Sequence, residues 1–291
     1  MLIYSLIAGV LFGLYFTLIG IGLNLIFGVM KLVNLAHGDF VIVGGFFACA
    51  LFAAAGVNPL ATAGLLLVPM FVVGVVIYYG IVRRLRLSRD AEMLSLILFF
   101  GVSKIMEAAA GLVLGTSEQS IPSFALGAGP MQLLGQSFPK TWIYAAGVSA
   151  VAVIAVYVYL YRTKLGILTR AVMDNDDEAV MTGINVDRIC AIALGISLML
   201  AGVAGVFAPF MLGSITPAAG VDLSVAAFAV IVIGTLGNPL GAMLGGIIYG
   251  ISLMLMQTYM SSWANVLPNV LLIAVLLVRP QGLLARQVRS A

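Results

Sequence analysis

Apolar runs of about twenty residues recur along the whole chain, and this pattern limits the possible fold more than any other feature. Of the 291 residues, 63% are hydrophobic and only 9% are charged, whereas about a quarter of the residues in a typical soluble domain are charged. A helix of about 20 apolar residues crosses the hydrocarbon core of a bilayer. We therefore expect an all-α polytopic membrane protein, with residues 1–291 forming a single transmembrane domain.

The apolar runs predict eight or nine transmembrane helices. Their residue ranges are 3–29, 35–55, 60–82, 91–114, 141–161, 188–212, 222–236, 241–260 and 265–279. The short seventh and eighth ranges are each expected to be either a full span or a re-entrant segment.

Basic residues gather on one side of this predicted membrane. Twelve of the 14 Lys and Arg residues fall there, and the exceptions are Lys104, inside a span, and Lys140, on the far side. The positive-inside rule assigns the richer side to the cytoplasm. The N-terminus is then external, the C-terminus is cytoplasmic, and residues 115–140 form the longest external loop. The net charge of +3 follows from this topology and does not indicate nucleic-acid binding.

Residues 162–188 form a charged island in the apolar sequence, which the predicted orientation places in the cytoplasm. The island holds nine of the 25 charged residues (14 basic and 11 acidic). An acidic run at 174–178 precedes the apolar residues 179–181, which predicts a short helix with an acidic first turn and an apolar face. Such a helix outside the membrane suits a groove on a partner protein, and a solvated loop is the alternative.

Small and polar residues interrupt the apolar pattern at two places, 31–38 (KLVNLAHG) and 234–241 (GTLGNPLG). Non-helical backbone at membrane depth must be buried in protein or line a water-filled cavity, because lipid cannot satisfy its hydrogen bonds. Paired breaks in two halves of a chain are typical of a transport pathway, which makes Asn34, Thr235 and Asn238 candidate pathway residues. Two ordinary tight cytoplasmic turns explain the pattern equally well.

Lys104 and Glu107 lie three residues apart in the span 91–114, on one face of the helix. Each unpaired charge near the bilayer centre costs roughly 2.5–3.5 kcal/mol on an insertion scale, so the two are expected to pair or to face the bundle interior. We interpret them as a packing ion pair, with a gate or a polar lining of a pathway as the alternative, and keep both as pathway candidates.

His37 and Asn24 complete the candidate pathway residues. His37 is the single histidine and lies at a span end, near Asn34 and Asp39. We interpret it as a helix-cap and turn residue rather than a proton relay. Asn24 lies inside the first span, where it either lines a pathway or hydrogen-bonds to a neighbouring helix.

Small residues recur four positions apart in several spans. The pairs are Gly9 and Gly13, Gly241 and Gly245, and Gly246 and Gly250. Such pairs let helices approach closely, so we expect them to pack inside one bundle or against a second copy or relative.

The sequence lacks the patterns of several common enzymes. None of the four lysines follows a glycine, so no phosphate-binding loop of the Gly-x-x-x-x-Gly-Lys-Ser/Thr type is present. One histidine and two separated cysteines offer no metal site, and no Gly-x-Ser-x-Gly sequence indicates a serine hydrolase. We expect no cofactor on this chain and no enzymatic activity. Transport remains, driven by an ion gradient or by a separate ATPase.

Three segments and the C-terminal ending form a combined pattern. Its residues are Asn34 to Gly38 with Gly28 before and Gly44-Gly45 after; Gly166, Arg170-Ala171, Glu178-Ala179 and Gly183-Ile184-Asn185; Pro217 to Gly250, including Val232-Ile233-Gly234 and Pro239-Leu240-Gly241-Ala242; and the ending Arg279 to Leu283. In these residues the sequence resembles the permease subunits of ABC importers for branched-chain amino acids, and specifically the smaller of the two permease types.

The resemblance implies that the island is the coupling segment that docks on an ATPase subunit. The candidate coupling residues are Gly166, Arg170, Asp174, Asp176, Asp177, Glu178, Ala179 and Gly183. The resemblance also implies a second permease subunit, two cytoplasmic ATPase subunits that use ATP, an external solute-binding protein, and a place in the bacterial inner membrane.

This chain departs from the family pattern near the expected pathway. Thr235 and Asn238 stand where many relatives have glycines and a serine, Ala226 stands where a lysine is common, and Lys104 occupies a usually apolar position. The substrate therefore stays open among branched-chain or related amino acids, amides and urea. The alternatives are an ion-coupled carrier acting alone through Glu107, Asp39 or Asp222, a membrane scaffold, and a sugar-type ABC permease.

Overall fold

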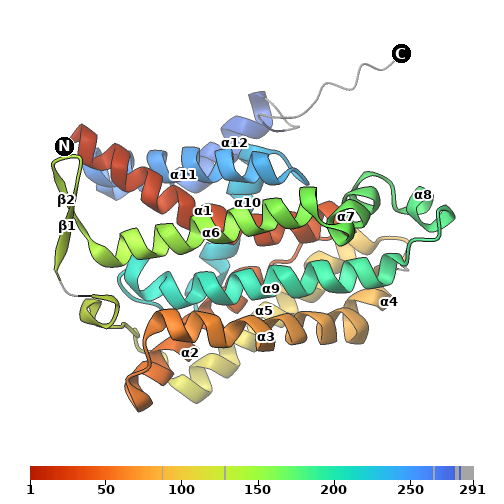
Figure 1. Ribbon diagram of the computed structural model, residues 1–291, viewed down its shortest axis with the longest axis horizontal. Helices are drawn as coiled ribbons and strands as arrows, with labels where there is room; N and C mark the ends of the chain where they lie inside the picture. The colour runs from red at the N-terminus through yellow and green to blue at the C-terminus, as the bar shows by residue number, and fades with distance from the viewer. Residues whose placement is uncertain (87, 128, 265, 279–281, 283–291) are drawn as a thin grey trace.

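The computed structural model describes residues 1–86, 88–127, 129–264, 266–278 and 282, and these residues are mainly helical (Figure 1). The α-helices are α1 (Leu2–Met30), α2 (His37–Ala55), α3 (Pro59–Ile77), α4 (Arg83–Arg86), α5 (Ala91–Leu114), α6 (Lys140–Arg162), α7 (Lys164–Asp174), α8 (Asp176–Met181), α9 (Val186–Met211), α10 (Ala219–Gly234), α11 (Pro239–Tyr259) and α12 (Leu267–Val278). A π-helical turn, η1 (Tyr78–Val82), joins α3 to α4, and the single-turn helices η2 (Ser123–Leu126) and η3 (Ser261–Trp263) lie in loops.

Seven helices in the described part of the chain are long and apolar enough to cross a membrane. They are α1, α2, the continuous helix 59–86, α5, α6, α9 and α11. The prediction of an all-α polytopic membrane protein is confirmed, and the range 241–260 corresponds to the 21-residue helix α11. α10 has 16 residues and is shorter than a full span. The ninth predicted range, 265–279, corresponds to α12, and its two end residues lie outside the described residues. The same is true of the ending 279–283, apart from Gly282.

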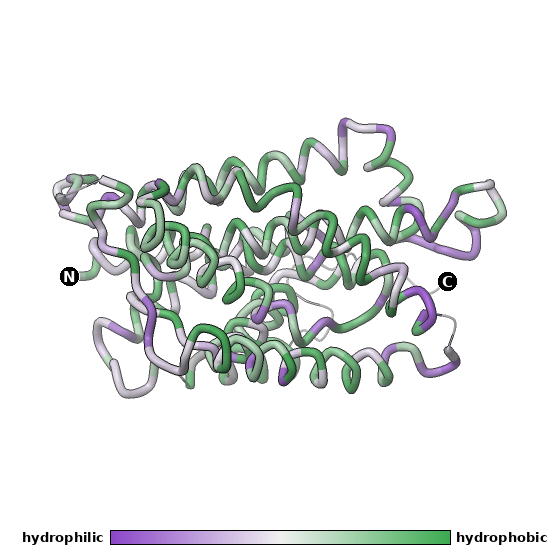
Figure 2. The backbone as a smooth tube through the Cα atoms, turned by 90° about the horizontal axis from the view of Figure 1, so that it is seen from below, coloured by the Kyte–Doolittle hydropathy of each residue, from purple (hydrophilic) through white to green (hydrophobic). Residues whose placement is uncertain are grey.

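The two ends of the bundle differ in character (Figure 1). One end, here called the charged end, carries α4, α7 and α8. The other, the hairpin end, carries the antiparallel strands β1 (Pro130–Leu133) and β2 (Gln136–Pro139) beside the N-terminus. Figure 2 shows hydrophobic backbone along the helices and hydrophilic residues gathered mainly at the ends. The composition of 115–140 predicted a loop but gave no sign of the hairpin.

α2 begins in the middle of the bundle. After α1 ends, residues 31–36 return toward the interior without regular structure, and α2 starts at His37. The ring nitrogen Nε2 of His37 hydrogen-bonds to the backbone oxygen of Ile19 at 3.0 Å. Ile19 lies eleven residues before the end of α1, which is about 16 Å along a helix axis. The first interruption in the apolar pattern is therefore a re-entrant segment.

α10 begins beside the start of α2, and its chain arrives from the hairpin end. The backbone N–H of Gly38 donates to the hydroxyl of Ser224 at 2.8 Å, and this hydroxyl donates to the backbone oxygen of Leu35 at 2.6 Å. A Cβ atom on Gly38 would overlap the backbone oxygen of Gly220. The N-termini of α2 and α10 thus meet inside the bundle.

The second interruption, 234–241, is a tight turn between α10 and α11. Gly237 has a positive φ of 76°, which a glycine adopts without steric cost. The side-chain oxygen of Asn238 caps α11 by accepting from the backbone N–H groups of Leu240 (3.0 Å) and Gly241 (3.3 Å). The two interruptions therefore have different structures, although their compositions are alike.

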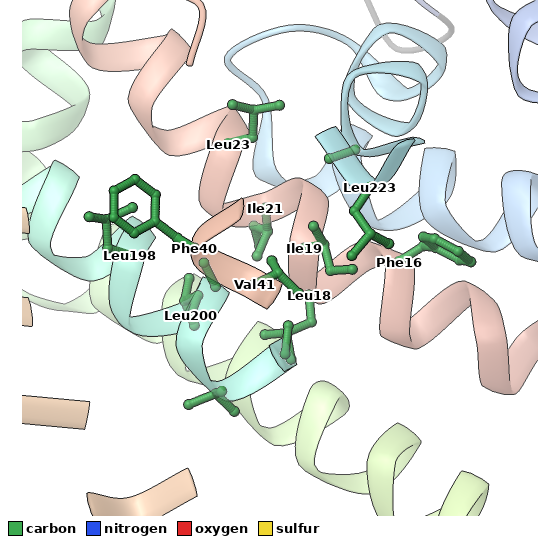
Figure 3. Packing of buried hydrophobic residues seen from close by; sticks show 14 of the residues in the cluster. Phe16, Leu18, Ile19, Ile21, Leu23, Phe40, Val41, Leu198, Leu200 and Leu223 are labelled. Atoms are coloured by element: carbon green, nitrogen blue, oxygen red, sulfur yellow. The ribbon is translucent and has the colours of Figure 1, made fainter. Parts of the chain in front are cut away.

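The small-residue pairs pack within this one chain. Cβ atoms on Gly9 and Gly13 would overlap the backbone of Ile251 and Ile247 in α11, and Gly250 lies against Gly13. These glycines let α1 and α11 touch along their backbones, which maximises van der Waals contact where no hydrophobic force acts between helices. Larger apolar side chains of α1, α2, α9 and α10 pack against one another to form the hydrophobic core (Figure 3).

The crossing of α2 and α9 gives a direct test of this packing. A Cβ atom on Gly205 would overlap the backbone oxygen of Val41, whereas one on Gly64 would meet nothing within 4 Å. We expect Gly205→Ala to destabilise the protein by about 1–3 kcal/mol, the usual cost of overpacking. Gly64→Ala is expected to be neutral or stabilising by about 0.4–1 kcal/mol. Thermal unfolding of the two detergent-purified variants checks this, and equal midpoints would contradict the assigned packing.

Candidate functional site

The island folds as two short helices attached to the charged end. α7 turns back on the end of α6, where the Thr163 hydroxyl accepts from the N–H of Gly166 (3.0 Å) and donates to the backbone oxygen of Tyr159 (2.7 Å). A Cβ atom on Gly166 would overlap that same Tyr159 oxygen and crowd Leu160. Gly166 is therefore needed for the close return of the chain.

Arg170 fastens α7 to α6. Its Nε atom donates to the backbone oxygen of Leu160 at 3.0 Å, and its guanidinium lies 4.7 Å from the ring centroid of Tyr161. Arg groups stack favourably on aromatic faces in this way. Arg170, one of the coupling candidates, therefore has a structural role within this chain, because it holds α7 against α6.

α8 is the predicted short helix with an acidic first turn. Asn175 caps it by accepting from the backbone N–H groups of Asp177 (3.1 Å) and Glu178 (3.3 Å), and the Asn175 amide donates to the Glu178 carboxylate at 2.8 Å. Asp176, Asp177 and Glu178 occupy the first turn, where a negative charge is favourable. The side chains of all three are exposed.

α8 ends in a Schellman arrangement around Gly183. The N–H of Ile184 donates to the oxygen of Ala179 (3.0 Å) and the N–H of Gly183 to that of Val180 (2.9 Å), with Gly183 at a φ of 83°. Ala179 is buried, while Val180 is 60% and Met181 is 85% exposed. The predicted apolar face is therefore divided, because Ala179 faces the protein and the other two face away from it.

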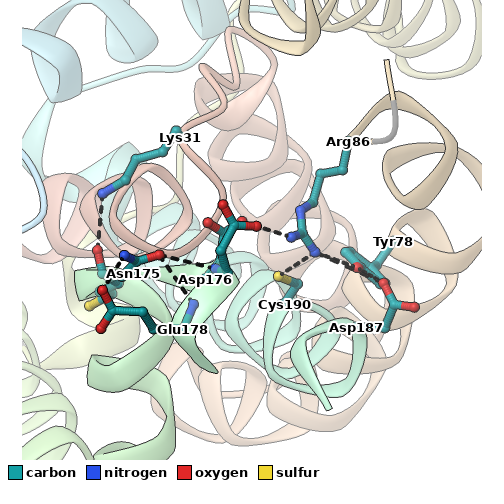
Figure 4. Close-up of polar contacts among 10 residues, drawn as sticks. Lys31, Tyr78, Arg86, Asn175, Asp176, Glu178, Asp187 and Cys190 are labelled. Carbon is teal, nitrogen blue, oxygen red and sulfur yellow. Dashed lines mark hydrogen bonds and ion pairs between the residues drawn. The ribbon is translucent and has the colours of Figure 1, made fainter. Parts of the chain in front are cut away.

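Charged residues tie α8 to α4 and α9 (Figure 4). The Arg86 guanidinium lies 3.3 Å from the carboxylate of Asp176 and 3.9 Å from that of Asp187. The hydroxyl of Tyr78 donates to Asp187 at 2.7 Å. On the other side of the island, the Lys31 ammonium donates to the backbone oxygen of Met173 at 3.2 Å. The island is thus attached to α1, α4, α6 and α9 at once.

A cavity of about 700 Å³ lies under the island at the charged end. Lys31, Arg170, Asp174 and Asn238 line it. The structure therefore brings part of the island and part of the second interruption to one place.

Asn24 and Thr235 hold the turn of the second interruption. The side-chain oxygen of Asn24 accepts from the N–H of Gly237 at 2.6 Å, so Asn24 hydrogen-bonds to the turn between α10 and α11 and not to a neighbouring helix, as one of its two predicted roles had it. Gly282 packs against Thr235. Both residues are placed to shape the charged end of the bundle.

Asn34 and His37 shape the re-entrant segment. The side-chain oxygen of Asn34 accepts from the N–H of Ala36 at 3.0 Å and forms a local turn. His37 lies in a turn, as expected, since its backbone N–H donates to the oxygen of Asn34 at 3.3 Å. Its interpretation as a helix cap is wrong, because no side-chain cap is made at this helix start and the ring instead bonds to Ile19 of α1. The His37 ring is fully buried beside α1, and the sequence could not indicate that its partner is a backbone oxygen of that helix.

Lys104 and Glu107 form the expected pair, at 2.7 Å, near the middle of α5. Their side chains are 49% and 29% exposed, and both line a cavity of about 680 Å³. The carboxylate of Asp39 lies within electrostatic range of both and beside the Ser103 hydroxyl. The pathway candidates therefore divide into two groups, one at the charged end and one at mid-depth, at the start of α2 and on the largely exposed helix α5.

Several residues of these sites were not predicted. Ser103 and Ser224 carry no distinctive sequence pattern, and the basic cluster 83–86 indicated only the orientation. The one sequence feature that pointed to a polar site here was Asp39, an acidic residue next to the first interruption.

This bundle of long apolar helices with one charged end defines the chain as an all-α multi-pass membrane protein. The chain belongs to the family described as branched-chain amino acid transport system / permease component, whose model matches residues 5–276. This confirms the resemblance drawn from the sequence.

Curated relatives match along nearly the whole chain. The high-affinity branched-chain amino acid transport system permease protein LivH of Escherichia coli (strain K12) is 30% identical over 288 residues, covering 96% of this chain and 94% of the relative. The probable branched-chain amino acid transport permease protein LivH of Methanocaldococcus jannaschii is 29% identical, covering 91% and 87%. The high-affinity permease protein BraD of Pseudomonas aeruginosa is 27% identical, covering 97% and 95%. No solved structure matches the chain.

The cap of α8 gives a test of the island's structure. Asn175→Ala removes an N-cap, which costs about 0.5–2 kcal/mol, so we expect faster amide hydrogen exchange across 176–181. The matched control is Asn58→Ala, since Asn58 caps α3 in the same way by accepting from Leu60 at 2.9 Å. Its effect should stay at the start of α3. Unchanged exchange in α8 would show that the cap does not stabilise this helix.

Proposed function

We propose that this chain is the membrane-spanning permease subunit of an ATP-binding-cassette importer that moves branched-chain or related amino acids across the cytoplasmic membrane. The observation that carries the proposal is a capped helix, α8, which presents Val180 and Met181 to solvent at the charged end. Exposed apolar side chains on a short helix outside the membrane suit a groove on another protein. The names of the relatives support the substrate class.

The charged end faces the cytoplasm in this proposal. The excess of Lys and Arg on that side supports the orientation, and the N-terminus and the hairpin end are then external. The island 162–188 is the cytoplasmic coupling loop, and residues 115–140 form the external loop of a single permease domain, 1–291.

The remaining subunits follow from the same proposal. ATP is bound and hydrolysed by two cytoplasmic ATPase subunits, because this sequence has no phosphate-binding loop. A second permease subunit completes the membrane part, and an external solute-binding protein delivers the amino acid. This chain binds no cofactor of its own.

Reconstitution tests the transport mode. We expect proteoliposomes that contain this chain, its partner permease and the ATPase subunits to accumulate radiolabelled leucine only with internal ATP and external binding protein. Liposomes that contain this chain alone, under a proton or sodium gradient, should accumulate none. Gradient-driven uptake by the single chain would instead establish the ion-coupled carrier.

Met181 gives the sharpest test of docking. Met181→Asp puts a charge where an apolar contact is proposed, so the ATPase subunits should dissociate at least about tenfold more readily, as expected for losing 1.4 kcal/mol or more. The matched control is Leu134→Asp, a similarly exposed apolar residue (81% against 85%) at the hairpin end. Co-purification of the ATPase with each variant is the measurement. Equal retention with both would contradict docking at α8.

A further inference from the structure

We propose that Lys104 and Glu107 bind the two charged groups of a zwitterionic amino acid in the cavity beside α5, and that the apolar part of the same cavity receives an aliphatic side chain. This inference rests on the proposed function and assigns its substrate contacts. The position of the pair, its incomplete hydrogen bonding, its charge and the cavity lining each support the assignment.

The pair lies near mid-depth and opens into the cavity. Lys104 is the fourteenth residue of the 24-residue helix α5, a helix that is largely exposed in this chain. Lys104 and Glu107 both line the cavity, and the Lys104 side chain is 49% exposed. Charged side chains at this depth face the bundle interior or a water-filled cavity, because exposure to hydrocarbon is costly.

The pair leaves most of its hydrogen-bonding capacity open toward that space. An ammonium has three donors and a carboxylate about four acceptor positions, whereas the structure gives one contact between them, from Nζ of Lys104 to Oε2 of Glu107. The ammonium and carboxylate of an amino acid are attached to the same carbon. A substrate in the cavity therefore satisfies both side chains at one place, its carboxylate on Lys104 and its ammonium on Glu107.

Asp39 stands behind the pair and supports this assignment. Its side chain is only 3% exposed, and its Oδ2 atom accepts no hydrogen bond from the described residues. It lies within electrostatic range of both members of the pair, repelling the Glu107 carboxylate and attracting the Lys104 ammonium, so it adds a second negative charge near the proposed position of the substrate ammonium. A singly charged ligand would satisfy one member of the pair and be repelled by the other.

The rest of the cavity selects an aliphatic side chain. Its volume of about 680 Å³ lies within the usual range of small-molecule sites. Ala108, Leu112, Pro217 and Ala218 supply apolar walls from α5 and from the loop that precedes α10. The hydrogen bond from Ser214 to Glu118 at 2.9 Å holds this loop against the chain that follows α5.

A double substitution separates this proposal from a structural ion pair. An ion pair that is this exposed contributes little to stability, so Lys104→Met combined with Glu107→Met should leave assembly and binding-protein-stimulated ATP hydrolysis near the wild-type level. We expect leucine uptake by the reconstituted importer to fall at least about tenfold, since two charge-assisted hydrogen bonds to the substrate are lost. Uptake within about twofold of wild type would overturn the proposal.

Single substitutions decide the matter if the double variant fails to assemble. Lys104→Arg keeps the positive charge and should retain uptake, whereas Lys104→Gln keeps a hydrogen bond to Glu107 but should lose uptake; equal uptake by the two would overturn the proposal. Lys140→Met removes a positive charge outside the cavity and should have no effect. A wild-type complex that imports no amino acid contradicts the proposed function itself, whereas an active wild type with an equally active double variant contradicts only this site.

Discussion

The hydroxyl of Ser224 joins two helices that start inside the bundle, and the interior of the protein depends on this contact. It accepts from the N–H of Gly38 at the start of α2 and donates to the backbone oxygen of Leu35 just before it. The first N–H groups of any helix lack partners within the helix, and lipid supplies none. One side chain of α10 thus makes it possible for α2 to begin at mid-depth.

Glycine makes this meeting sterically possible. Gly38 and Gly220 bring the first turns of α2 and α10 into backbone contact, and Gly44 and Gly205 do the same for α2 and α9. With α2 held this close, the carboxylate of Asp39 comes within electrostatic range of Lys104 on α5. The approach of Asp39 to Lys104 therefore depends on glycines at other positions of α2, α9 and α10.

The sequence predicted the helices well because hydropathy marks where each apolar segment ends, and it predicted the pairing of Lys104 with Glu107 because that pairing is local. It did not distinguish the re-entrant segment 31–36 from the turn 235–238, since both are short, polar and rich in small residues. α7 was also missed, because Gly166 in its first turn is a poor helix former and its apolar residues Leu165 and Ile167 are exposed. The approach of Asp39 to Lys104 joins residues 65 positions apart, so no local pattern encodes it.

The re-entrant segment also connects the two candidate sites. Lys31 bonds to Met173 at the end of α7, and only six residues later α2 begins at His37, with Asp39 in its first turn. The stretch of chain between the contact with α7 and Asp39 is therefore short and mostly buried. A helix that began at the membrane surface would place several helical turns between the same two points. The depth at which α2 starts therefore shortens the path along the chain between the island 162–188 and the cavity.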